Sequence, residues 1–138
     1  MNLTLKRGVF AGAANLITGL GLGWLIGIIL PAIAEEYQNT AIFRPWSDPR
    51  MMVYFAYPFI LGLAYAYIWS MVERQFKGND RIERAGQFAK LYFIIATVPG
   101  MFITYTSFQV SLMMVLLWTV TGYMQAFVAG WIFASVKK

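Results

Sequence analysis

The stretch at residues 91–136, LYFIIATVPGMFITYTSFQVSLMMVLLWTVTGYMQAFVAGWIFASV, decides the fold because it runs for 46 residues without a charged side chain. As a single α-helix it would be about 69 Å long, at roughly 1.5 Å per residue. The hydrocarbon core of a bilayer is only about 30 Å thick. The stretch must therefore fold back on itself as two spans. Its only cluster of polar residues lies at 104–111, and the turn is expected there.

Two other stretches without a charge, at residues 8–34 and 51–72, are each one span long. Charged side chains in the middle of a membrane are costly and rare. The pattern predicts an all-α integral membrane four-helix bundle forming one domain at residues 1–138, with spans at about 8–30, 51–72, 88–108 and 112–136.

The composition agrees with a membrane protein. Hydrophobic residues make up 59% of the chain and charged residues 12%, against about 25% charged residues in soluble domains. The chain has no Cys and no His, which removes thiolate and imidazole ligands and the commonest general base. We therefore expect no metal, no cofactor and no enzyme activity. The acids Glu35, Glu36 and Asp48 could meet a lipid headgroup or a divalent cation, but no nucleophile motif accompanies them.

The basic residues set the expected orientation. Nine Lys and Arg residues flank the spans on the side of the two termini, and only Arg44 and Arg50 lie on the other side. The positive-inside rule then places both termini in the cytoplasm, and we expect a multi-pass protein of the bacterial inner membrane. The net charge of +5 is explained by this orientation, without a nucleic-acid partner. A cleaved signal peptide ending at residue 34 is disfavoured, because its apolar run would be too long.

Small residues recur every fourth position in the first and last spans, so that they share one face of each helix. Such stripes let two helix backbones approach closely in a membrane. One reading is packing within the bundle; the other is self-association or docking to a larger membrane complex. The stripes consist of Gly19, Gly23 and Gly27 in the first span, and of Gly122, Ala126 and Gly130 in the last.

A few uncharged polar residues lie within the expected spans. A buried amide without a partner is costly, so Asn15 and Gln125 are expected to bond to each other or to a tyrosine hydroxyl. The alternative is a polar pocket for a small neutral or lipidic ligand. Without a carboxylate or an amine, such a cluster has no carrier for proton coupling. Its members are Asn15, Tyr65, Thr97 and Gln125.

The loop between the second and third spans carries Lys77, Arg81 and Arg84. These side chains are expected to face anionic lipid headgroups, and a regulatory phosphoinositide site is the sharper alternative. Asp80 and Glu83 have the spacing of a capping box, so a helix should begin near Asp80.

The chain resembles small, uncharacterised bacterial four-span membrane proteins of the domain-of-unknown-function type. The resemblance rests on Gly23-Trp24-Leu25, on the element at residues 62–67 (GLAYAY), on Gly130-Trp131 and on Lys137-Lys138. It covers most of the chain and implies a four-helix bundle, without an activity or a site. Small multidrug transporters also have four spans, but they use an embedded acid in the first, where this chain has only Asn15.

Three functions from different classes remain. The favoured one is a structural or accessory integral membrane protein that associates, through its glycine-rich helix faces, with itself or another membrane protein. The alternative is an oligomeric small-molecule or lipid transporter or binding protein with an inner polar pocket, which Pro58 and Pro99 would help to shape as kinks. An enzyme acting on lipid is the third. In each case membrane lipids are expected partners.

Overall fold

The computed structural model describes residues 2–136, and within that range the chain is helical and has no strand. Four of its described helical segments are long and apolar enough to cross a membrane. They are α1 (Leu3–Ile29); η1 (Pro49–Ala56) with α3 (Tyr57–Val72); α4 (Arg81–Tyr92), η2 (Phe93–Thr97) and α5 (Val98–Ser107); and α6 (Leu112–Ser135). A short helix, α2 (Pro31–Glu36), follows α1.

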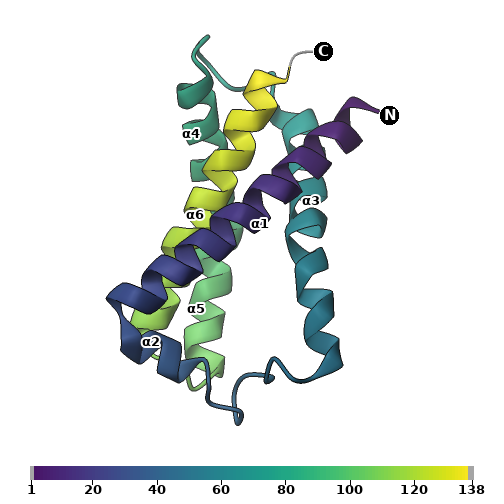
Figure 1. Ribbon diagram of the computed structural model, residues 1–138. Helices are drawn as coiled ribbons and strands as arrows, with labels where there is room; N and C mark the ends of the chain where they lie inside the picture. Colours follow the sequence, from purple (N-terminus) through teal and green to yellow (C-terminus); the bar gives the residue numbers. More distant parts are fainter. Residues whose placement is uncertain (1, 137–138) are drawn as a thin grey trace.

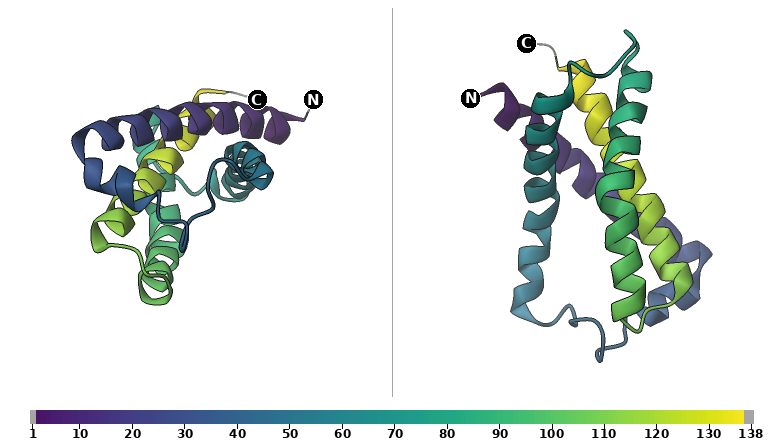
Figure 2. Two further views of the ribbon diagram at one scale, coloured as in Figure 1. Left: turned by 60° about the horizontal axis from the view of Figure 1, so that its bottom comes forward. Right: turned by 180° about the vertical axis from the view of Figure 1, so that it is seen from behind.

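The segments form a bundle with two distinct ends (Figure 1). Both described chain ends and the α3–α4 connection lie together at what we call the terminal end. The opposite end, here the loop end, holds α2, the loop to η1 and the turn between α5 and α6. Helix α1 runs obliquely across α3 and α6, and α3 diverges from α5 toward the loop end (Figure 2).

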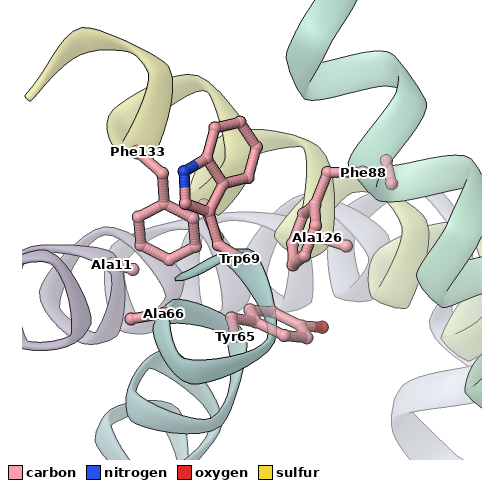
Figure 3. Close-up of a cluster of buried hydrophobic side chains, with 9 residues drawn as sticks. Ala11, Tyr65, Ala66, Trp69, Phe88, Ala126 and Phe133 are labelled. Carbon is pink, nitrogen blue, oxygen red and sulfur yellow. The ribbon is translucent and has the colours of Figure 1, made fainter. Parts of the chain in front are cut away.

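An aromatic core joins three helices in the half of the bundle nearer the terminal end (Figure 3). Trp69 of α3 lies with its ring centroid 5.5 Å from Phe88 of α4 and 5.5 Å from Phe133 of α6. Tyr65, one turn before Trp69, meets Phe88 edge to face at 5.7 Å. All four side chains are almost fully buried. Edge-to-face pairs, here those of Phe88 with Trp69 and with Tyr65, add about 0.5–1.5 kcal/mol beyond their buried area.

The tightest helix contact is between α1 and α3, where glycines face each other. A Cβ atom added to Gly62 of α3 would lie 2.5 Å from the Gly12 nitrogen and 2.5 Å from the Gly8 oxygen of α1. These are backbone atoms and cannot rotate away. Only glycine fits at Gly62, and this contact fixes the crossing of the two helices.

The loop end has a smaller apolar cluster, which ties α2 to the start of α6. Its buried members are Ile33, Val110, Met114 and Val115. A hydrogen bond from the Ser111 backbone N–H to Glu36 Oε1, 2.7 Å long, fixes the same junction. The carboxylate of Glu36 therefore has a structural role at the end of α2.

The structure places the α5–α6 turn and the start of α4 where the sequence predicted them. Helix α5 ends at Ser107 and α6 begins at Leu112, so the turn between them, at residues 108–111, lies inside the polar cluster at 104–111. Helix α4 begins at Arg81, and Asp80 Oδ1 accepts from the Ile82 N–H at 3.4 Å.

The two prolines expected to kink spans lie at changes of helix type. Pro58 lies in the first turn of α3, directly after the 3₁₀ segment η1. Pro99 lies in the first turn of α5, directly after the π-helical segment η2, where the Val98 N–H donates to the Phe93 oxygen. Local 3₁₀ or π geometry is a common way for a spanning helix to satisfy the backbone groups that a proline frees.

Candidate functional site

The small residues of α6 pack inside the chain. A Cβ atom on Gly122 would lie 3.3 Å from Thr97 Cγ2, and one on Gly130 would lie 3.0 Å from Ala85 Cα. Ala126 is fully buried in the aromatic core. This stripe therefore serves the contact between α6 and the α4–η2 segment.

The stripe on α1 is different, because most of it has no neighbour. A Cβ atom on Gly19 would lie 3.3 Å from Gln125 Nε2 of α6. Around Gly23 and Gly27, by contrast, no described atom of another part of the chain comes within 4 Å of the added Cβ. Packing inside the bundle, one of the two readings of this stripe, therefore does not account for Gly23 and Gly27.

Large apolar side chains lie beside the uncovered glycines, on the same half of α1. Leu20 and Trp24, which lie within about 100° of Gly23 around the helix, are both more than half exposed. We call this surface the glycine face of α1, comprising Gly23 and Gly27 with the apolar side chains that flank them. It is wide enough to meet a second helix and carries no charge.

Asn15 lies one turn before Gly19 and is completely buried. Among the described residues its amide nitrogen Nδ2 and its oxygen Oδ1 have no hydrogen-bond partner. The expected bond from Asn15 to Gln125 or to a tyrosine is therefore wrong. The Gln125 side chain instead lies against Gly19.

Two other members of the expected polar cluster, Thr97 and Tyr65, lie against residues outside that cluster. Thr97 lies against Gly122, and its buried Oγ1 has no partner in the described part of the chain. Tyr65 belongs to the aromatic core, where its ring meets Tyr92 edge to face at 4.6 Å. The structure thus shows two separate unpaired polar groups, on α1 and on η2.

Replacing Asn15 by leucine should stabilise the bundle. A buried polar group without a partner costs about 1–3 kcal/mol, and leucine has the same branched arrangement of four side-chain heavy atoms without that cost. We expect the free energy of unfolding in detergent to rise by about 1 kcal/mol or more. Asn15→Asp provides the opposite control, since it buries a charge. A loss of stability in Asn15→Leu would contradict this prediction.

Sequence reasoning missed a charged cluster at the terminal end, which we call the Arg7–Glu73 cluster (Arg7, Trp69, Glu73 and Arg84). Arg7 Nη1 lies 3.1 Å from Glu73 Oε2, and the two side chains are 7% and 16% exposed. Trp69 Nε1 donates to the same carboxylate oxygen at 2.9 Å. Arg7 Nη2 also donates to the Val136 carbonyl at 3.0 Å. One arginine therefore links the start of α1 to the ends of α3 and α6.

Arg84 belongs to this cluster, which corrects the expectation that it faces lipid headgroups. Its Nη2 atom donates to the Glu73 carbonyl at 2.9 Å. Its guanidinium lies over the Trp69 ring, 5.4 Å from the centroid, in a cation–π arrangement. The side chains of Lys77 and Arg81 are exposed, and their contact with headgroups stays a prediction.

One sequence signal could have revealed the cluster. Glu73 is the first charge after the second uncharged stretch, and Trp69 precedes it by four residues, which places the indole and the carboxylate on one helix face. Arg7 is likewise the last charge before the first stretch. Two opposite charges at adjoining span ends are natural partners.

The acids of the loop end are largely engaged in structural contacts. Asp48 Oδ1 accepts from the Arg50 backbone N–H at 2.9 Å, and Asp48 Oδ2 accepts from Arg44 Nη1 at 2.6 Å. These hydrogen bonds, the backbone one foremost, hold the pKa of Asp48 below its ordinary value. In the described range no three His, Cys, Asp or Glu side chains are grouped to hold a metal ion.

The chain was compared with protein families, with curated proteins and with solved structures. No family model matches it, and no curated protein and no solved structure is significantly similar to it.

Proposed function

We propose that this chain is a multi-pass protein of the bacterial inner membrane, with both termini in the cytoplasm. Four apolar helical segments of spanning length support the placement. The excess of Lys and Arg at the terminal end supports the orientation. The loop end then faces the outside.

The orientation can be tested by labelling single cysteines, since the chain has no Cys of its own. Ser47→Cys and Asn79→Cys both change exposed loop residues, at the loop end and the terminal end respectively. A membrane-impermeant maleimide should label Ser47→Cys in intact spheroplasts, and Asn79→Cys only after lysis. The reverse pattern, or equal labelling of both before lysis, would contradict the proposed topology.

Within the membrane, we propose a structural or accessory role in which the chain associates through the glycine face of α1. The observation that supports this role is the open space around Gly23 and Gly27. The space beside Gly12 and Gly62, by contrast, is occupied by a neighbouring helix. Helix association in lipid depends on close backbone approach, and small residues four apart provide it. A row of glycines is self-complementary about a two-fold axis, so a second copy of the chain is the partner that we favour.

Two glycines on α1 allow a matched test. Gly21 and Gly23 both have open space around an added Cβ within the chain, so both should accept leucine without disturbing the fold. They point in nearly opposite directions on the helix. We expect Gly23→Leu to convert the assembly to monomers in mild detergent, and Gly21→Leu to leave it intact. Light scattering and native mass spectrometry measure the mass. A monomeric wild type without a partner, or an assembled Gly23→Leu, would contradict the proposal.

A second candidate function has one observation in its favour. The unpaired amide of Asn15, buried among apolar helices, is what a binding protein or transporter for a small neutral ligand would present. The stability of Asn15→Leu decides between this function and a purely structural interior, because a ligand site would lose its polar contact.

A further inference from the structure

The loop that joins α2 to η1 encloses a half-open cavity of about 360 Å³ at the loop end. Three aromatic side chains line it, from Tyr37, Phe43 and Trp46, and Arg44 and Gln38 add polar groups. Neither the glycine face of α1 nor the Arg7–Glu73 cluster takes part in it. The cavity thus combines ring surfaces with a cation.

The walls of the cavity are held in place from outside. Tyr37 and Phe43 lie 5.2 Å apart between ring centroids, and Trp118 of α6 lies 6.2 Å from each of them. Trp118 Nε1 also donates a hydrogen bond to the Tyr37 hydroxyl. On the other side, Trp46 meets Tyr54 of η1 edge to face at 5.8 Å. The rings are therefore fixed by helices rather than by the loop alone.

Arg44 retains free hydrogen-bonding capacity. Its Nη1 atom pairs with Asp48 Oδ2, while its side chain is still 44% exposed. A guanidinium has five N–H donors, so the donors of Arg44 that do not bind Asp48 can reach a ligand. A phosphate suits them, because two of its oxygens can accept two parallel N–H bonds. The faces of Trp and Tyr rings attract ammonium groups. The cavity can therefore receive both halves of a molecule that carries a phosphate and an ammonium.

We infer that this cavity binds an ammonium–phosphate group, supplied by the headgroup of a zwitterionic phospholipid. The phosphate would lie on Arg44 and the ammonium against the rings of Tyr37, Phe43 and Trp46. The inference rests on the membrane placement proposed above, because the loop follows α1 and precedes η1 and would lie at headgroup level. It does not depend on association through α1.

Lipid retention tests the inference. The purified protein is equilibrated in mixed micelles with equal amounts of phosphatidylethanolamine and phosphatidylglycerol, and retained lipid is counted by native mass spectrometry. We expect phosphatidylethanolamine to be enriched and Trp46→Leu to reduce the enrichment about three- to tenfold. Arg44→Gln should instead reduce the retention of both lipids, because both carry the phosphate. Trp131→Leu is the matched control, because Trp131 is 47% exposed and lies on α6, outside both the cavity and the glycine face of α1. Equal retention of the two lipids, or unchanged enrichment in Trp46→Leu, would overturn the inference.

Soluble headgroups separate a lipid from a free phosphate ester. Calorimetric titration with phosphoethanolamine should show binding, and glycerol 1-phosphate, which lacks the ammonium, should bind several-fold more weakly. Binding of phosphoethanolamine without any lipid preference would overturn the lipid source and assign the cavity to a free ester. This titration needs no bilayer, so a failure of the proposed membrane topology, seen by maleimide labelling, is distinguishable from a failure of the cavity to bind.

Discussion

Gly62→Ala should destabilise the bundle by about 3 kcal/mol, although alanine normally favours a helix over glycine. The added Cβ would lie 2.5 Å from two backbone atoms of α1, at Gly8 and Gly12, and the helices can make room only by moving apart. Overpacking of this kind typically costs about 1–3 kcal/mol, and rigid backbone on the other side places the cost at the upper end. Thermal and denaturant unfolding in detergent measure the change.

Gly100→Ala provides the matched control for this prediction. Gly100 lies in α5, and no described atom beyond its own helical surroundings comes within 4 Å of an added Cβ. The substitution should therefore stabilise by about 0.5–1 kcal/mol, the ordinary gain of alanine over glycine in a helix. The two variants are expected to differ in sign. Equal effects at both positions would mean that α1 and α3 do not approach as closely as described.

Arg7→Met should cost about 3–5 kcal/mol, because it removes one side of a buried ion pair. Glu73 would then keep the Trp69 indole but lose the Arg7 guanidinium, and removing one partner of a buried ion pair is strongly destabilising. The methionine retains the apolar stem of arginine, so the change reports on charge more than on packing. Unfolding at neutral pH, followed by circular dichroism, measures the loss.

The exposed pair of Arg44 and Asp48 is the internal comparison for Arg7. Arg44→Gln should cost less than about 1 kcal/mol, as exposed ion pairs do. The double variant Arg7→Met with Glu73→Leu should lose less free energy of unfolding than the sum of the losses in the two single variants, since both charges are gone. A small effect of Arg7→Met, similar to that of Arg44→Gln, would contradict a structural role for the Arg7–Glu73 cluster.

The number of long apolar helical segments could be predicted from the sequence because charged residues separate the uncharged stretches. Residues 91–136 are too long for one span and carry polar residues in the middle, so the α5–α6 turn followed directly. The start of α4 followed from Asp80, whose side chain caps the helix. Such features depend only on neighbours in the sequence.

Features that depend on how the helices face one another could not be predicted. The stripes on α1 and α6 look alike in the sequence, yet Gly130 is packed against Ala85 and Gly23 has open space. Helix α1 crosses both α3 and α6 obliquely (Figure 1). Gly8 and Gly12 meet α3, whereas a Cβ on Gly23 would have no described atom of another helix within 4 Å. Arg84 was misplaced for the same reason, because nothing in its own segment indicates the Trp69 ring beside it.

Disulfide cross-linking at Gly23 tests the central claim, association through the glycine face of α1, most directly. The chain contains no Cys, so a single Gly23→Cys or Gly21→Cys variant can form a disulfide only with another molecule. Under mild oxidation in native membranes, Gly23→Cys is expected to give a covalent dimer and Gly21→Cys to stay monomeric, with both thiols alkylated equally under reducing conditions. Equal cross-linking of the two variants, or none at Gly23, would contradict the claim.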